Sequence, residues 1–398
     1  MNLSKKIELC QLSPIRKFYP YSLAAQQRGI KIHHLTIGQP DIQTPPAYLQ
    51  AIAQYQQQVL SYAPSPGIPS MIEAVRNYYA RLGVDYDADD ILITTGGSEA
   101  LLMAMLCILD EGDEIIVPEP FYPNYHTFIR ASGGKICPIP TLAEDGYRYA
   151  KAERIVPLIN EKTRAILITN PGNPTGTLLT QEEVRLIADI AKAHELYLIC
   201  DEVYREFIYE GQMSTAAALE DMAENLIMID SVSKRFSACG ARIGALITRN
   251  RRLMEGAVKI AQARLSVATL DQVGAEALYS VDSSYFDTVR EEYRHRRDVC
   301  YRKMSEIPDV VVAEPKGAFY MMAKLPIEDA EDFQIFLLNE FDDQGETVMF
   351  APGSGFYATE GAGKSEIRIA YVLCAEHLER ALDILRLGLE KYLEKQSK

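Results

Sequence analysis

The chain has 398 residues, of which 47% are apolar and 24% are charged, as in an ordinary globular protein, so wholesale disorder is excluded. At ~150 residues per domain, this length predicts two or three folding units. The 41 Lys and Arg against 55 Asp and Glu give a net charge of −14, which argues against a protein that coats nucleic acid or docks on an anionic membrane.

The cysteines are scattered and form no CxxC pair, and several lie in apolar runs. This usage is typical of buried thiols in a reducing compartment rather than of disulfides or zinc ligands. The longest apolar run, residues 100–109, is shorter than the ~20 residues that span a bilayer. No apolar stretch follows Lys5 and Lys6 as it would in a secretory signal. We therefore expect a cytoplasmic protein without a membrane segment.

From about residue 90, short β-branched runs alternate with amphipathic helical stretches. The runs are nearly continuous in apolar character, as strands covered on both faces must be. The predicted strands are residues 91–94, 114–117, 165–169, 197–200, 226–230 and 243–248. Between two of them, Thr180-Gln-Glu-Glu183 is a capping box that opens a helix. The alternation predicts an α/β fold with a mostly parallel, doubly wound sheet covered by helices.

After about residue 280 the strict alternation stops. We expect a long charged helix over 284–305, short strands near 310–312, 318–324, 347–351 and 366–372, and a final amphipathic helix over 375–394. This pattern favours a smaller α+β domain. We therefore predict a large domain at 41–285, a small one at 286–398, and an N-terminal segment, 1–40, that packs on the small domain.

Lys234 directly follows a predicted buried strand, at the sheet edge where open α/β folds place their ligands. Ser231, Ser233 and Arg242 surround it in the sequence and could form a pocket of hydroxyls and positive charge for a phosphate. A desolvated lysine among cations has a lowered pKa, and its free amine can form a Schiff base. An ordinary surface lysine is the alternative.

Further motifs occur in a fixed order along the chain. They are Gly38-Gln-Pro-Asp41, Leu60-Ser-Tyr62 leading to Gly67, Thr95-Gly-Gly-Ser-Glu99, Asn170-Pro-Gly-Asn-Pro-Thr-Gly176, Asp201-Glu-Val-Tyr204, Ser231-Val-Ser-Lys234 with Arg242, and Arg368-Ile-Ala-Tyr371. This ordered set resembles the class I and II aminotransferases that use pyridoxal phosphate, of fold-type I in the aspartate aminotransferase superfamily. The resemblance covers nearly the whole chain and implies a transaminase that attaches the cofactor to Lys234.

The resemblance also implies how the cofactor is held. Asp201 would keep the pyridinium nitrogen protonated, so that the ring is an electron sink, and Tyr204 and Asn173 would bond the ring oxygen. The helix start at Gly97, Ser98 and Glu99 would cradle the phosphate together with the serines and Arg242, since free N–H groups there attract an anion. Tyr122 would stack on the ring, with Phe121 as the adjacent competitor. We therefore list Lys234, Asp201 and Tyr204 as catalytic.

Arg368 interrupts an apolar predicted strand, and a buried arginine is costly unless it is paired. The resemblance makes it the anchor of the substrate α-carboxylate, with Gly38 and Asn173 beside it; a structural salt bridge is the alternative. Tyr62 would reach across a two-fold interface to the neighbour's cofactor phosphate. That role implies a homodimer with shared active sites.

The substrates implied are an L-amino acid and a 2-oxo acid. Ser98 stands where acidic-substrate members of a related bacterial subgroup have a lysine, which weakens an aspartate assignment. Arg16, Lys17 or Arg264 could still supply a cation for a distal carboxylate, so aspartate-type, aromatic, alanine-type and broad specificity stay open. A C–S β-lyase using the same lysine, aspartate and arginine is the alternative activity. A regulator that only senses the cofactor is a further alternative, although we see no segment for a DNA-binding domain.

Two other site types are not indicated. His33 and His34 have no third ligand at a metal-like spacing, so we predict no metal site. No Gly-x-Gly-x-x-Gly follows the first predicted strand, which argues against a nicotinamide dinucleotide site.

Overall fold

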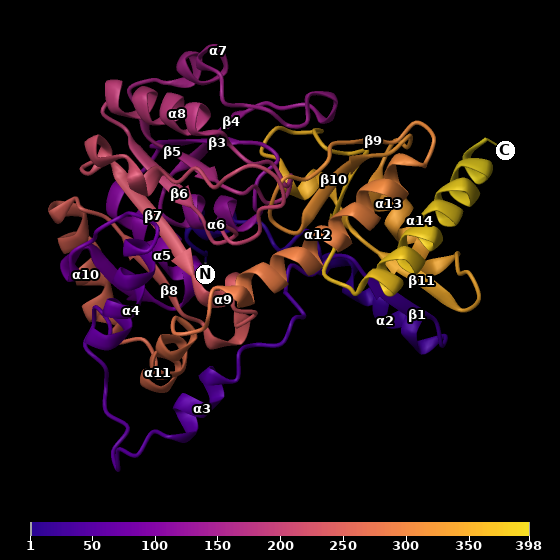
Figure 1. The fold of residues 1–398 in the computed structure, drawn as a ribbon. Coiled ribbons are helices and arrows are strands. Elements are labelled where there is room, and N and C mark those ends of the chain that lie inside the picture. Colours follow the sequence, from indigo (N-terminus) through magenta and orange to yellow (C-terminus); the bar gives the residue numbers. More distant parts are fainter. Residues whose placement is uncertain (1, 398) are drawn as a thin grey trace.

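The computed structural model describes residues 2–397 and contains two units, each built on its own sheet (Figure 1). We call them the large unit, on a seven-stranded sheet, and the small unit, on a four-stranded sheet. The large sheet has the order β2-β8-β7-β6-β5-β3-β4, and β8 runs opposite to the other six strands. The predicted α/β fold with a mostly parallel sheet is therefore confirmed.

The strands of the large sheet are short and mostly buried, as their continuous apolar runs predict. They are β2 (Ile91–Thr94), β3 (Glu114–Pro118), β4 (Lys135–Ile139), β5 (Thr163–Thr169), β6 (Tyr197–Asp201), β7 (Leu226–Ser231) and β8 (Gly244–Ile247). The sequence does not predict β4, because this edge strand contains Pro138 and begins at the exposed Lys135. Its parallel pairing with β3 extends the sheet.

Alternate residues of these strands point into two separate cores. One core holds Ile93, Ile168 and Met228 beneath α4 and α8, and the other holds Leu92 and Ile229 beneath α5, α6 and α10. The helices of this unit are α3 (Ala47–Ala53), α4 (Pro69–Ala80), α5 (Gly96–Ile108), α6 (Asn124–Ala131), α7 (Ala152–Ile155), α8 (Gln181–Ala193), α9 (Val232–Arg235), α10 (Arg251–Arg264) and α11 (Thr269–Leu278). The expected capping box is present at α8, where Thr180 Oγ1 accepts from the N–H of Glu183.

The helix α12 (Ser284–Ser305), which has the predicted bounds, runs from the large unit to the small one (Figure 1). The small unit has an antiparallel sheet of order β12-β13-β10-β9. Its elements are β9 (Val311–Val312), β10 (Tyr320–Lys324), α13 (Ala330–Asn339), β11 (Glu346–Met349), β12 (Ala351–Pro352), β13 (Glu366–Ala370) and α14 (Ala375–Gln396). The boundaries 41–285 and 286–398 stay a prediction.

The N-terminal segment, which we expect on the small unit, touches both units. Strand β1 (Lys31–His34) pairs in parallel with β11, and α2 (Tyr19–Gln27) lies against α13. The short helix α1 (Lys5–Glu8) lies against α6 of the large unit, and Lys6 pairs at 3.6 Å with Glu111, which lies between α5 and β3. The segment between them therefore crosses from one unit to the other, past the carboxyl edge of the large sheet.

Candidate active site

A cavity of about 630 Å³ lies between the two units, and the N-terminal segment forms part of its wall. Its floor is the carboxyl edge of β5, β6 and β7, where strands of a parallel sheet present their following residues to a ligand. The lining includes most of the predicted site residues: Gly38, Gly97, Ser98, Tyr122, Asn173, Asp201, Tyr204, Ser231, Ser233, Lys234, Arg242 and Arg368.

Lys234 lies on the single turn of α9, which directly follows β7. The turn is fixed by Ser231, whose Oγ accepts from the N–H of Ser233 at 3.1 Å. The amine Nζ of Lys234 donates to the carbonyl oxygen of Gly38 at 2.9 Å, and the thiol sulfur of Cys239 lies 3.7 Å away. The half-buried amine has no carboxylate within 4.0 Å among the described residues, so it is not tied up in a salt bridge.

One end of the cavity gathers hydroxyls, a guanidinium and a helix N-terminus. Ser231 Oγ and Ser233 Oγ lie 2.8 Å apart, and Arg242 Nη1 donates to Ser233 Oγ at 3.4 Å. The helix α5 begins at Gly96, which has φ +74°, and a Cβ there would lie 2.4 Å from Arg242 Nη2. Because a helix start and a guanidinium both attract anions, this end suits a phosphate.

Asp201 closes β6 and is almost fully buried. Its Oδ2 accepts from the hydroxyl of Tyr125 at 2.6 Å, and the same hydroxyl lies 2.7 Å from Thr169 Oγ1. Burial raises the pKa of Asp201 to about 6, and the bond from Tyr125 keeps the pKa from rising further. The carboxylate is thus costly to ionise without a cation beside it.

Two neutral side chains line the cavity next to Asp201. The amide Nδ2 of Asn173 donates to the hydroxyl of Tyr204 at 3.3 Å, and this hydroxyl lies 3.0 Å from that of Tyr320. Burial raises the pKa of Tyr204 well above its ordinary value, so the phenol stays protonated and can donate a hydrogen bond. Tyr320 comes from β10 of the small unit, so the two units meet in this contact.

Arg368 lies in the middle of β13 and is 4% exposed. Its guanidinium donates to Thr36 O at 2.7 Å and to Asn173 Oδ1 at 3.2 Å, and it packs against the rings of Tyr320 and Phe356. Its Nε has no partner, and no carboxylate lies within 4.0 Å in the described part of the chain. Burial lowers the pKa of this arginine, as expected of a cation without a counter-ion. The structural salt bridge that the sequence leaves open is absent there.

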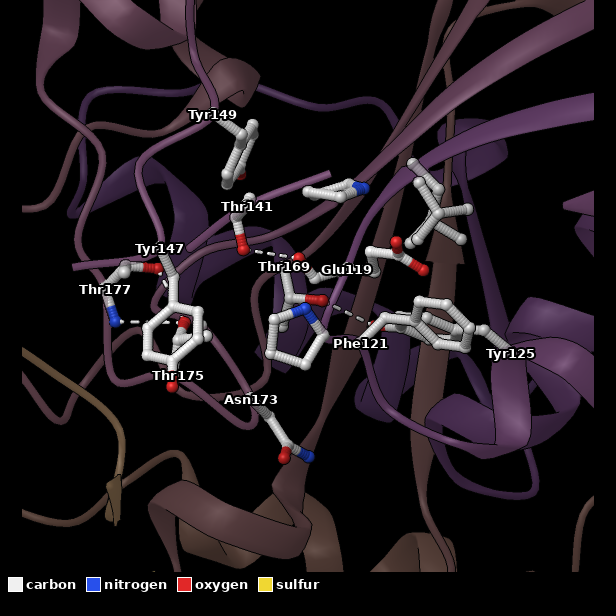
Figure 2. Close-up of a pocket in the computed structure, with 15 residues that line it drawn as sticks. Glu119, Phe121, Tyr125, Thr141, Tyr147, Tyr149, Thr169, Asn173, Thr175 and Thr177 are labelled. Carbon is white, nitrogen blue, oxygen red and sulfur yellow. Dashed lines mark hydrogen bonds between the residues drawn. The ribbon is translucent and has the colours of Figure 1, made fainter. Parts of the chain in front are cut away.

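A second cavity of about 20 Å³ shares Tyr125, Thr169 and Asn173 with the first and is shown in Figure 2. Phe121 faces this small cavity, whereas Tyr122 faces the large one. Of the two aromatic residues that the sequence proposes for stacking, Tyr122 is therefore the one in the site. Its hydroxyl accepts from Asn124 Nδ2 at 2.6 Å, and burial raises its pKa to about 12.

Four predicted residues are not brought into the cavity wall. The carboxylate of Glu99 accepts from the N–H of Thr95 and pairs with Arg264 at 2.8 Å, so both side chains are already engaged. Lys17 pairs with Glu331 at 2.5 Å. Tyr62 is 80% exposed on the surface of this single chain. Of the cations proposed for a distal carboxylate, only Arg16 lines the cavity.

The structure also adds Tyr125, Tyr320 and Cys239 to the site, residues that the sequence assigns no role. Tyr125 contacts a residue 76 positions away and Tyr320 one 116 positions away, so no local pattern marks either contact. The only signal for Tyr125 is its place in the aromatic run that also contains Tyr122. Among the described residues, no group of three or more His, Cys, Asp or Glu could hold a metal ion.

Comparisons with known proteins place this geometry in context. Residues 30–385 match the family described as aminotransferase class I and II. The chain is 28% identical to the aspartate aminotransferase of Bacillus subtilis, over 98% of this chain and 100% of that protein. It is 31% identical to aromatic-amino-acid aminotransferase 2 of Thermococcus litoralis, over 100% and 99% of the two chains.

Solved structures agree with these relatives. The Thermus thermophilus aspartate aminotransferase with maleate has a TM-score of 0.89 at 26% identity, over 98% of this chain and all of that one. The alanine aminotransferase from Pyrococcus furiosus has a TM-score of 0.90 at 29% identity, with the same coverage. These relatives are all aminotransferases, which does not favour the C–S lyase alternative.

Proposed function

Because the chain belongs to the class I and II aminotransferases and is a transaminase, we propose that it works with pyridoxal phosphate bound at Lys234. The observation that carries this proposal is that a free amine, Lys234, and a buried guanidinium without a carboxylate, Arg368, line the same cavity. An amine can hold an aldehyde covalently, and a free guanidinium can hold a carboxylate.

The residues present fit this cofactor. Gly96 leaves room for Arg242, because a Cβ at that position would lie 2.4 Å from its Nη2, and Arg242 with Ser231 and Ser233 forms a cradle for the phosphate. The N–H groups at the start of α5, at Gly97 and Ser98, complete it. Glu99 would contribute through its backbone, since its carboxylate is bound to Arg264.

The remaining groups would hold the ring. Asp201 would hold the protonated ring nitrogen, and this cation would offset the cost of ionising the buried carboxylate. Tyr204 and Asn173 would donate to the ring oxygen, and Tyr122 would cover one face. When bound, pyridoxal phosphate stabilises the negative charge that develops at the substrate Cα.

The chain's own residues would then move the substrate and one proton. Arg368, with Asn173 and the backbone at Gly38, would bind the α-carboxylate and so orient the Cα–H bond. Lys234, once its amine is free, would take the Cα proton as general base and return it as general acid. Its amine already lies 2.9 Å from Gly38 O, on the side of the cavity where the carboxylate would bind.

For the substrate, we infer that acidic or aromatic L-amino acids are donors and 2-oxo acids are acceptors. The relatives from Bacillus subtilis and Thermococcus litoralis are named for aspartate and for aromatic amino acids, which supports this range, and the Pyrococcus furiosus alanine aminotransferase makes alanine a further donor to test. Arg16 lies on the wall of the cavity without an ion-pair partner in residues 2–397, so it could meet a distal carboxylate where Ser98 cannot.

We also infer that the protein is a cytoplasmic homodimer. The exposed Tyr62 supports the dimer, since a second subunit would cover it and bring it to the partner's phosphate. The free cysteines support a reducing compartment. Over residues 2–397, no helix is long and apolar enough to cross a membrane.

A screen of single half-reactions tests the proposal. Purified protein loaded with pyridoxal phosphate is mixed with each amino acid in turn, and the cofactor's absorbance band is followed. We expect aspartate, or an aromatic amino acid, to convert the cofactor to its amine form, and a 2-oxo acid to restore the band. If no amino acid changes the band, the proposal is wrong. It is also wrong if a cysteine thioether yields pyruvate and ammonia without an oxo acid, which is the reaction of a C–S β-lyase.

A further inference from the structure

Glu119 has a buried carboxylate that belongs to neither the proposed cofactor site nor the substrate site. It directly follows β3 in the large unit and is 3% exposed. Its Oε2 accepts from the N–H groups of Ala358 and Thr359, both at 3.1 Å, and its Oε1 accepts from Thr359 Oγ1 at 2.6 Å. No cation lies within 4.0 Å in the described residues. A buried carboxylate is thus satisfied by one loop of the other unit.

Glu119 is itself held firmly in the large unit. Its carbonyl oxygen accepts from Thr141 Oγ1 at 2.5 Å, and its N–H donates to Ile139 O at 3.1 Å. Figure 2 shows this contact with Thr141 at the small cavity, beside Phe121 and Tyr125. The carboxylate therefore presents a fixed pair of acceptors to a loop that is otherwise exposed at Ala358 and Thr359.

The same loop leads to Arg368. Phe356, two residues before Ala358, is fully buried, and its carbonyl oxygen accepts from the N–H of Phe121 at 2.8 Å. The guanidinium of Arg368 lies 4.9 Å from the centre of the Phe356 ring. A ring on the face of a guanidinium fixes its plane, and the plane decides whether both N–H groups can point at a carboxylate.

We propose that Glu119 is a positioning residue for substrate binding: it holds the 356–359 loop so that Phe356 keeps Arg368 in the orientation that binds the α-carboxylate. This inference rests on the proposed role of Arg368. It assigns Glu119 no contact with the substrate. Glu119 would act on Arg368 through geometry rather than charge. The three hydrogen-bond donors of the loop need acceptors at fixed places, and the Glu119 carboxylate contacts no reacting group.

The experiment compares Glu119→Ala with Glu119→Gln in protein loaded with pyridoxal phosphate. The glutamine oxygen can still accept from both N–H groups, and its amide can donate to Thr359 Oγ1. Two carboxylates serve as probes, maleate and 3-phenylpropionate, and their dissociation constants are measured from the change in cofactor absorbance. Hydrogen exchange of residues 353–365 is measured by mass spectrometry.

We expect Glu119→Ala to speed exchange in the loop and to weaken both probes about tenfold. Glu119→Gln should stay within about threefold of the unchanged protein. Thr359→Val, which removes one donor and leaves both N–H groups, should give a smaller effect of the same kind, and it keeps the test valid if Glu119→Ala does not fold. Glu144→Gln is the matched control, because it breaks the exposed Lys324–Glu144 pair, which also joins the units, without touching Phe356.

Three results would overturn the inference. Unchanged probe binding in Glu119→Ala and Thr359→Val would show that the loop does not control Arg368. Equal weakening by Glu144→Gln would show that any contact between the units has the same effect. A loss in Glu119→Gln as large as in Glu119→Ala would show that charge matters rather than geometry. If neither probe binds the unchanged protein, the role of Arg368 in the proposed function is what fails.

Discussion

The hydroxyl of Tyr125 donates a hydrogen bond of 2.6 Å to the buried carboxylate of Asp201. The two effects on this carboxyl oppose each other, because burial favours the neutral form whereas the bond from Tyr125 favours the ionised form. Burial is the larger, so the pKa is about 6 rather than the ordinary 3.8. At neutral pH Asp201 is therefore ionised although it is buried, and this lowers the stability of the folded protein until a cation binds beside it.

This cost predicts how Asp201→Asn changes the stability of protein freed of cofactor. Because the folded-state pKa is raised, the stability that this carboxyl contributes is present below about pH 4 and is lost as the pH rises through about 6. The asparagine amide of the variant does not ionise, so its stability does not fall with rising pH in this way. We expect the variant to be more stable by about 1–3 kcal/mol at pH 7.5, with the difference vanishing near pH 4.

Urea unfolding at the two pH values measures this difference. Tyr125→Phe is the contrasting variant, since it removes the donor that stabilises the ionised form, and it should lower stability at pH 7.5 more than at pH 4. A less stable Asp201→Asn variant at pH 7.5 would contradict the cost assigned to burial.

Replacing Arg368 should likewise raise the stability of the protein while it lowers the activity. Arg368→Met removes a buried cation without a counter-ion, so we expect the free energy of unfolding to rise by about 1 kcal/mol. The same change should lower kcat/KM for every amino acid by about a hundredfold or more, because the substrate carboxylate loses its partner. Arg368→Lys keeps the charge but not the planar guanidinium, and its kcat/KM should lie between that of the unchanged protein and that of Arg368→Met.

Denaturant unfolding and kcat/KM are measured on the same preparations. Cofactor affinity is measured alongside and should fall far less than kcat/KM, because in the described residues Arg368 contacts no part of the phosphate cradle and bonds only Asn173 among the proposed ring ligands. A variant that loses stability and activity together would indicate an ordinary structural arginine.

Gly96 tests the phosphate cradle. A Cβ at Gly96 would lie 2.4 Å from Arg242 Nη2, so Gly96→Ala must displace the guanidinium. We expect the dissociation constant of pyridoxal phosphate to rise by about tenfold. Gly83→Ala is a matched control: Gly83 has φ +79°, close to the +74° of Gly96, but a Cβ there meets nothing within 4 Å.

Both variants carry the same backbone strain of about 1–2 kcal/mol, so both should lose some stability. Only Gly96→Ala should lose cofactor affinity, as measured by titrating pyridoxal phosphate into protein freed of it. Equal affinities in the two variants would remove Arg242 from the proposed cradle.

The sequence predicts the strands of the large sheet well, because strands buried on both faces must be continuously apolar. It misses β4, whose Pro138 and exposed Lys135 suit an edge strand. Within the site, Lys234, Asp201 and Arg368 stand out because a charged residue beside or within an apolar strand is costly. Tyr125 and Glu119 do not, since their roles depend on partners 76 and 239 or more residues away, and such contacts leave no mark on local patterns.

Tyr62 allows a test of the shared active site. It is exposed in the single chain, so the proposal requires its hydroxyl to reach the phosphate bound by a partner subunit. Tyr62→Phe should weaken cofactor binding by about tenfold through loss of one hydrogen bond to a charged group. Subunits carrying Lys234→Ala should be inactive, because they lack the amine.

A hybrid dimer of one Tyr62→Phe subunit and one Lys234→Ala subunit shows whether Tyr62 acts across the interface or within its own subunit. If Tyr62 acts across the interface, the Tyr62→Phe subunit contributes Lys234 to one site, and the Lys234→Ala subunit contributes an intact Tyr62 to that same site. At a cofactor concentration that does not saturate Tyr62→Phe, the hybrid should then have about half the activity of the unchanged dimer, since one of its two sites is complete. If Tyr62 acts within its own subunit, the hybrid can have only half the activity of the Tyr62→Phe dimer. The hybrid is obtained by expressing differently tagged subunits together and purifying through both tags. Its activity at limiting pyridoxal phosphate distinguishes the two arrangements. Only if Tyr62 acts across the interface does the one remaining Lys234 have a complete set of phosphate ligands around it.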